Sequence, residues 1–170
     1  IIIDIRSNAG GVDDIATRLA GVFADGEHFV YTSQTRNGPN YNDFDEPLEH
    51  FTAKKGNQQY LKPVIVLTDR ATISAAEEFL LHIKAFAHVT QIGDSTAGDF
   101  SDVSALKFLP NGWIYAYSTQ MYLLPDDTSL DGIGHIPAIY SLNTLENVAI
   151  GKDAVMERAF DYLVEVYGIE

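Results

Sequence analysis

The chain has 170 residues, of which 46% are hydrophobic and 21% charged, a balance typical of one folded domain with a single core. Lys and Arg number 11 against 24 Asp and Glu, and a net charge of -13 repels phosphate backbones and anionic lipid, so we expect no nucleic-acid partner. The lack of cysteine excludes disulfides and thiolate catalysis, and no apolar run approaches the roughly 18 residues of a membrane span, so we expect no membrane contact from this segment.

The first predicted element is a strand at residues 1–5. IIIDI is almost wholly apolar, with no initiator Met and no polar residues ahead of it. Continuous apolar runs are typical of strands that are buried on both faces of a sheet. The abrupt start also predicts that residues 1–170 form the core of a single domain, cut from a longer protein and lacking its N-terminal parts.

A turn, SNAGG, then leads into a predicted helix over about 12–24. Its apolar positions share one face, which we expect to be buried: Ile15, Leu19, Val22 and Phe23. Residues 28–36 alternate well enough for a strand. Residues 37–60 are rich in Asn, Asp, Gly and Pro and predict a long surface excursion.

A second strand, turn and helix follow in VIVLTDRATISAAEEF, residues 64–79, which place Ser74 at the start of a helix predicted to run to residue 86. Glu77, Glu78 and Lys84 are expected on its outer side. A serine becomes a nucleophile when a base takes its proton and amides receive the oxyanion, and a helix N-terminus offers such amides. A structural interpretation stays open, because Ser74 and Glu77 also match the S-x-x-E capping box.

The last third predicts a short strand at 89–93, a turn at STAGD, and two longer strands, VSALKFLP and WIYAYSTQMYLLP, joined by Asn111-Gly112, a strong hairpin signal. A closing helix over 152–167 carries Val155, Ala159, Leu163 and Val166 in register. Parallel strand-helix units followed by an antiparallel hairpin predict a layered α/β domain.

These segments together resemble the S41 serine peptidases, which include the C-terminal processing (tail-specific) proteases and the tricorn core protease. IIIDIRSNAGG is similar to the family's D-x-R-x-N-x-G-G strand and turn, VLTDRATISAAEEF to its nucleophile segment, IGDSTAGD to its G-x-x-T-x-G turn and LDGIGHIPAIY to its E-G-x-G-x-x-P-D segment. The resemblance implies a ClpP/crotonase-like fold with a mostly parallel sheet, and hydrolysis of peptides or unfolded protein without a cofactor. It also implies an extracytoplasmic location, periplasmic or at the cell envelope.

Carried over by position, the resemblance makes Ser74 the nucleophile and forms the oxyanion hole from the amide of Ala75 and one from Gly10 or Gly11. Asp99 stands where processing proteases have their catalytic lysine, so a serine-lysine mechanism is disfavoured. The tricorn-like branch uses Ser, His and Glu, and its histidine lies upstream of the first motif, outside this chain.

Asp131 stands at the position of that glutamate, where a carboxylate orients a histidine or holds a water; the alternative is an Asp-Gly turn residue. His135 is expected to be a solvated loop residue, Lys84 and Lys107 are expected to be solvated, and Asp4 with Arg6 a structural pair.

The remaining histidines show no metal-ligand spacing, so no metal is expected. Aromatic residues of the hairpin are expected to form one of its faces or to border a specificity pocket: Trp113, Tyr115, Tyr117 and Tyr122. Two other functions stay open, a non-catalytic ligand- or peptide-binding domain on the same scaffold and, ranked lowest, an acyl-CoA enzyme of the crotonase fold.

Overall fold

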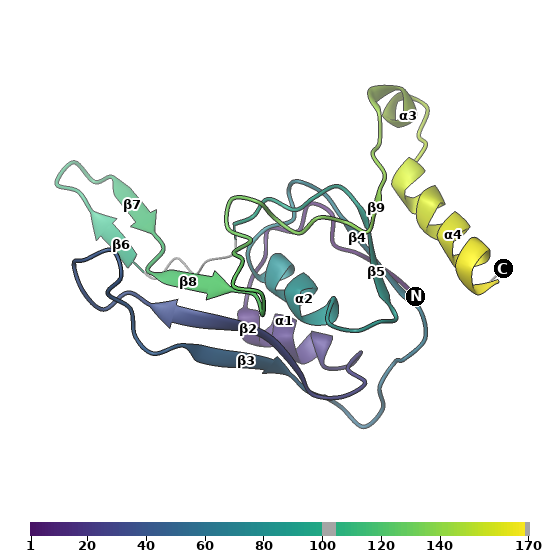
Figure 1. Ribbon diagram of the computed structural model, residues 1–170. Helices are drawn as coiled ribbons and strands as arrows, with labels where there is room; N and C mark the ends of the chain where they lie inside the picture. Colours follow the sequence, from purple (N-terminus) through teal and green to yellow (C-terminus); the bar gives the residue numbers. More distant parts are fainter. Residues whose placement is uncertain (100–104, 169–170) are drawn as a thin grey trace.

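The computed structural model of the protein describes residues 1–99 and 105–168. Its centre is a four-stranded parallel sheet in the order β1 (Ile2–Asp4), β4 (Val64–Thr68), β5 (Val89–Gly93) and β9 (Ile139–Tyr140) (Figure 1). The predicted α/β class with a mostly parallel sheet is confirmed.

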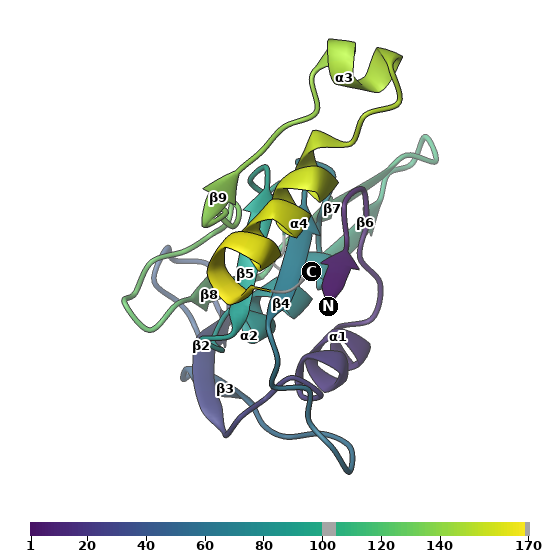
Figure 2. The same cartoon turned by 90° about the vertical axis from the view of Figure 1, so that its right-hand side faces the viewer.

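The strand β4 shows why the sheet is covered on both sides. All five of its residues are buried. Val64 and Val66 pack with α1 (Asp13–Ala20) and α2 (Ala75–Ile83), whereas Ile65 and Leu67 pack with α4 (Ala154–Tyr167). Figure 2 shows α4 on one side of the sheet and the other two helices across it. In such an apolar run, alternate side chains pack against the helices on the two opposite faces of the sheet.

The first strand forms as predicted, but it is not buried on both faces. Because β1 is the edge of the sheet, Ile1 is 51% exposed and Ile2 and Ile3 are half-buried.

The predicted inner face of α1 is wrong for Ile15 and Leu19. Val22 and Phe23, which follow the end of the helix, are half-buried and buried, respectively. Ile15 is 64% and Leu19 is 48% exposed, while Ala16 and Ala20 are buried in the cluster that includes α2. Small residues let two helices approach closely, so the face of α1 that carries the two alanines packs against α2 instead of the face that carries the larger apolar residues. The stripe of these larger residues is therefore left facing outward.

A second, antiparallel sheet has the order β3 (Leu48–Thr52), β2 (His28–Thr35) and β8 (Gln120–Leu123). The strand β2 was predicted. The strand β3 lies within the segment predicted as a surface excursion, so that prediction is wrong there; β3 pairs with β2 and places the fully buried Thr52 against α2.

The predicted hairpin is confirmed as β6 (Ala105–Phe108) and β7 (Ile114–Tyr117), with the Leu109 N–H donating to the Trp113 carbonyl oxygen at 2.7 Å. The start of its first predicted strand, at 103–104, lies outside the described residues. Its second predicted strand divides after Tyr117, and the chain continues as β8 in the other sheet.

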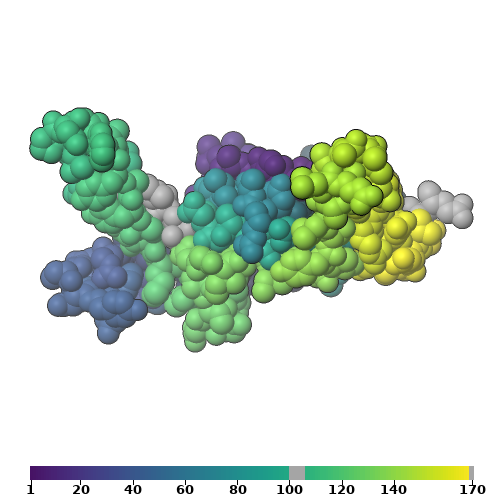
Figure 3. Space-filling view, turned by 90° about the horizontal axis from the view of Figure 1, so that it is seen from above, coloured from purple at the N-terminus to yellow at the C-terminus, as the bar shows by residue number. Residues whose placement is uncertain are grey.

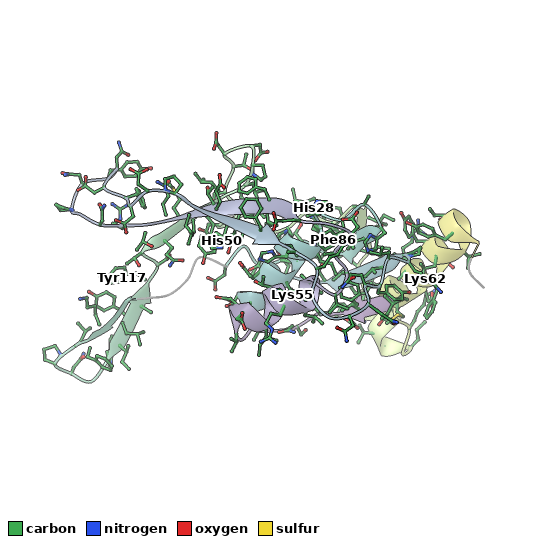
Figure 4. All side chains as sticks on the ribbon, turned by 90° about the horizontal axis from the view of Figure 1, so that it is seen from below. His28, His50, Lys55, Lys62, Phe86 and Tyr117 are labelled. Carbon is green, nitrogen blue, oxygen red and sulfur yellow. The ribbon has the colours of Figure 1, made fainter. Side chains whose placement is uncertain are left out.

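The hairpin projects from the body of the molecule (Figure 3), and Tyr117 lies out on it in Figure 4. Trp113, Tyr115 and Tyr117 are exposed, whereas Tyr122, in β8, is buried. After β9 a short helix, α3 (Leu145–Ala149), leads into α4, the predicted closing helix.

Candidate active site

Ser74 lies at the turn between β4 and α2 in an unusual backbone conformation. Its φ is 57° and its ψ is -132°, and it is one of three non-glycine residues with positive φ among those described. A residue with a Cβ pays steric strain there, and such strain is typical of nucleophiles held at a sharp strand-to-helix turn. The residue is exposed, and its N–H donates to the Asp99 carbonyl oxygen at 2.8 Å.

Hydrogen bonds join this turn to the opening turn of the chain. The Ile73 N–H donates to the Asn8 carbonyl oxygen at 3.1 Å, and the buried Thr72 hydroxyl donates to the Ile5 carbonyl oxygen at 3.0 Å. The Ser7 N–H donates to Asp69 Oδ1 at 2.8 Å. Both turns follow neighbouring parallel strands, so their loops meet at one edge of the sheet.

Gly10 is the residue at which the opening turn comes closest to the Ser74 turn. A Cβ built on it would lie 2.7 Å from the Ser74 Cβ and 2.8 Å from the Ala75 nitrogen, and its φ is +86°. Only glycine fits this contact. The Gly10 N–H donates to Asn8 Oδ1 at 2.9 Å, whereas the N–H groups of Gly11 and Ala75 have no acceptor within the described residues.

An apolar cavity of about 390 Å³ adjoins these amides. It lies between α1, α2 and the opening turn, and its lining includes Ile15 and Leu19, the outward stripe of α1. The lining also includes Gly10, Gly11 and Val12 from the segment before α1, and Ala75, Ala76 and Phe79 from α2. The exposed apolar face of α1 thus forms one wall of a hollow beside Ser74.

The capping-box interpretation of Ser74 and Glu77 is wrong. The Ser74 side chain makes no capping hydrogen bond. Glu77 is fully buried instead of exposed, and its carboxylate accepts from the Gly98 N–H at 2.8 Å and the Asp99 N–H at 2.9 Å. Glu77 therefore holds the 98–99 turn, whose Asp99 carbonyl oxygen in turn accepts from Ser74.

Glu78 is also buried rather than exposed as predicted. It accepts from the Tyr31 hydroxyl at 2.6 Å and contacts His82 Nε2 at 3.1 Å. Sequence reasoning missed both glutamates, because charged residues beside an apolar helix stripe ordinarily face water. The only hint of their burial in the sequence is that the two adjacent carboxylates directly follow an apolar Ala-Ala pair.

We expect Glu77→Gln to destabilise the site. A glutamine offers one carbonyl oxygen where the carboxylate accepts two N–H groups, so one amide loses its partner at a cost of about 1–3 kcal/mol. Urea unfolding of the variant measures this loss. Glu157→Gln, on the exposed surface of α4, is the matched control. Equal unfolding free energies for the two variants would contradict the role of Glu77.

The loop that carries Asp131 docks on the same turn. The Gly132 N–H donates to the Gly98 carbonyl oxygen at 2.7 Å, and a Cβ on Gly98 would lie 2.6 Å from the Gly134 nitrogen. Asp131 is half-buried, and its own N–H donates to the Ser129 hydroxyl at 3.3 Å. Asp99 is exposed. The structure thus brings the Asp131 loop against the segment whose Asp99 carbonyl oxygen accepts from the Ser74 N–H.

His135 is not a solvated loop residue, and this prediction is wrong. It is 3% exposed, its N–H donates to Thr96 Oγ1 at 2.7 Å, and burial lowers its pKa to about 3. Lys84 is exposed, as predicted. Its ammonium nevertheless donates hydrogen bonds to two protein acceptors, Gln91 Oε1 and the Ile136 carbonyl oxygen. Lys107 is exposed.

Of the other four histidines, three make polar contacts away from Ser74. The fourth, His88, stacks on Phe86 just before β5, at the opposite end of the parallel strands from the Ser74 turn. His82 contacts Thr52 and Glu78, His50 contacts the Ser33 hydroxyl at 2.7 Å, and His28 contacts Asp25. Within the described residues no group of His, Cys, Asp and Glu side chains is arranged to hold a metal ion, and no described helix has the length and apolar character of a membrane span.

Arg6 forms the structural pair expected with Asp4 and extends it to α4. Its guanidinium donates to both carboxylate oxygens of Asp4 and to both of Asp153, at 2.6 to 2.9 Å. These bonds hold the pKa of Asp4 and that of Asp153 below their ordinary values. Arg6 therefore fastens the first turn to the start of α4.

Known proteins resemble this chain in both sequence and fold. The sequence profile of peptidase family S41 matches residues 1–141. A carboxy-terminal-processing protease of Bartonella bacilliformis is 29% identical over 91% of this chain and 34% of its own length, and the carboxy-terminal processing protease CtpA of Bacillus subtilis is 25% identical over 97% of this chain and 37% of its own.

Among solved structures, a putative peptidase from Parabacteroides merdae is 29% identical and superposes with a TM-score of 0.87, covering 96% of this chain and 51% of that one. The chain spans about a third of the length of the curated relatives it matches. A family match over most of the sequence and the agreement of fold lead to one conclusion: the chain belongs to peptidase family S41.

Proposed function

We propose that this chain carries the nucleophile of a serine endopeptidase or processing protease, which cleaves peptide bonds through an acyl-enzyme on Ser74. The strained, exposed position of Ser74 carries the proposal, together with the neighbouring N–H groups of Gly11 and Ala75, which have no acceptor within the described residues. A purely structural serine at a helix start would use its hydroxyl as a cap, which this one does not. Membership of a peptidase family supports the same chemistry.

In this proposal the Ser74 oxygen adds to the carbonyl carbon of the scissile peptide bond, and the negative charge that develops on the carbonyl oxygen is received by two backbone N–H groups. One is from Ala75. Of the two glycines, Gly11 is favoured for the other, because the Gly10 N–H is already bound to Asn8. Gly10 then serves as the spacer that lets the two turns approach.

The base is proposed to be a histidine outside residues 1–170. It takes the Ser74 proton during acylation and passes it to the leaving amine. The same base then takes a proton from the water that attacks the ester, and delivers this proton to the Ser74 oxygen as the acid product leaves. The positions of the described histidines support this assignment. The rings of His28, His50 and His82 contact other side chains. His88 stacks on Phe86, and His135 is buried. Asp131 is proposed to orient that histidine through its carboxylate.

The apolar cavity beside the proposed oxyanion hole is a place for a side chain next to the scissile bond. Its walls are alkyl groups and the Phe79 ring, so we propose a preference for apolar residues there over charged ones. Peptides and unfolded proteins are the proposed substrates. By analogy with the processing proteases, the proposed location is extracytoplasmic.

A fluorophosphonate probe tests the proposal on the full-length protein. We expect stoichiometric labelling, with mass spectrometry placing the adduct on Ser74. Ser118, a half-buried serine at the base of the hairpin whose hydroxyl donates to the Gln120 carbonyl oxygen, is expected to stay unlabelled. Absence of labelling across a range of pH would favour a non-catalytic binding domain on the same scaffold. Weak labelling of residues 1–170 alone is expected, because the base is missing.

A further inference from the structure

A second apolar cavity, of about 400 Å³, lies at the far end of α2 from Ser74. It is enclosed by the C-terminal half of α2, the start of β2 and the segment that leads from β8 through the Asp131 loop. Its lining is mainly aliphatic and aromatic: Phe29, Val30, Leu81, Ala85, Leu124, Pro125, Leu130 and Ile136, with Lys84, Gly134 and His135. The peptidase chemistry proposed above makes no use of this cavity.

Lys84 is the one charged side chain among the lining residues. Its ammonium donates to Gln91 Oε1 at 2.9 Å and to the Ile136 carbonyl oxygen at 3.1 Å. An ammonium carries three N–H donors, and the third has no acceptor within the described part of the chain. The partners of Lys84 are both neutral, so its charge is not neutralised by any carboxylate of the lining.

Two further features determine the charge of the groups that line the cavity. Although Lys84 as a whole is exposed, partial burial lowers the pKa of its ammonium. His135 has a pKa of about 3 and is therefore neutral near pH 7, so it adds no second positive charge. The cavity is a local exception in a chain whose net charge is -13.

We propose that this cavity binds a carboxylate carried on an apolar chain, of the fatty-acid type, with the chain among the aliphatic side chains and the carboxylate on the Lys84 ammonium. The volume lies in the range of small-molecule sites, and such sites combine apolar walls with a few placed polar groups. A carboxylate supplies both a charge-assisted acceptor for the third N–H and the missing countercharge. An alcohol of the same length would supply only a neutral acceptor, and an amine would repel Lys84.

Isothermal titration of the full-length protein with decanoate, decanol and decylamine tests this. Decanoate is expected to bind saturably at one site, decanol at least about tenfold more weakly, and decylamine more weakly still. The affinity for decanoate should fall at alkaline pH, because the neutral amine no longer pairs with the carboxylate. Decanoate that fails to saturate, or that binds no better than decylamine, would overturn the proposal.

Variants locate the site. Lys84→Gln is expected to weaken decanoate at least tenfold and leave decanol unchanged, while Lys84→Arg retains most of the affinity. Ala85→Leu, which fills the cavity, should weaken both ligands. Lys62→Gln removes the same charge from an exposed loop residue at the opposite end from Tyr117 in Figure 4 and should change neither. Circular dichroism verifies folding. Equal losses for the Lys84 and Lys62 variants, or none for Ala85→Leu, would show adsorption to the surface instead of a site.

Discussion

Replacing Ser74 by alanine in the full-length protein is expected to lower kcat/KM for peptide hydrolysis at least about a thousandfold, because no other group can form the acyl-enzyme. Stability should change little, within about 0.5 kcal/mol, since the hydroxyl makes no capping hydrogen bond whose loss would matter. Initial rates on an unstructured peptide with apolar residues measure the first effect, and urea unfolding measures the second.

A glycine at the same position separates chemistry from folding. Ser74→Gly should be equally inactive, yet more stable than Ser74→Ala by roughly 1 kcal/mol, because glycine adopts the positive φ of 57° without steric strain. Ser118→Ala serves as the control with full activity. Hydrolysis that survives either substitution at position 74 would remove Ser74 from the mechanism, and equal stabilities would mean that the turn stores no strain.

The parts of the fold set by local pattern could be predicted from the sequence. The run VIVLT predicted a strand because its first four residues are all apolar, and all five residues are buried. Asn111-Gly112 predicted a hairpin because its glycine readily adopts a positive φ, which is 84° here. The resemblance to a family predicted that the glycine-bearing turn and the serine-bearing turn meet, and the hydrogen bond from the Ile73 N–H to the Asn8 carbonyl oxygen shows how they are joined.

The parts of the fold that depend on tertiary contacts could not be predicted from the sequence. On α1 the choice of buried face depended on how closely α2 approaches, which favoured Ala16 and Ala20 over the larger Ile15 and Leu19. Burial of Glu77 depended on the backbone amides of a turn more than twenty residues away, Gly98 and Asp99. Hydrophobic periodicity contains no information on such partners, and a buried carboxylate is favourable only where they exist.

Gly10→Ala is the second substitution for which we expect a large effect. The added methyl group would lie 2.7 Å from the Ser74 Cβ, 2.8 Å from the Ala75 nitrogen and 2.9 Å from the Ile73 carbonyl oxygen. None of these is the end of a flexible side chain, so the two turns must separate. Moving one proposed oxyanion donor away from the other is expected to lower kcat/KM about a hundredfold or more, and the overpacked contact to cost roughly 1–3 kcal/mol of stability.

Gly112→Ala is the matched control, because Gly112 has nearly the same positive φ, +84° against +86°, but no atom within 4 Å of the added methyl group. Both variants pay the backbone strain of a Cβ at positive φ, about 1–2 kcal/mol, and only Gly10→Ala also meets the Ser74 turn. The difference in unfolding free energy between them therefore isolates the steric contact, and the difference in fluorophosphonate labelling rate isolates its effect on the nucleophile. If the two variants were labelled at the same rate, the opening turn would have no part in positioning Ser74, and an oxyanion hole shared between the turns would be excluded.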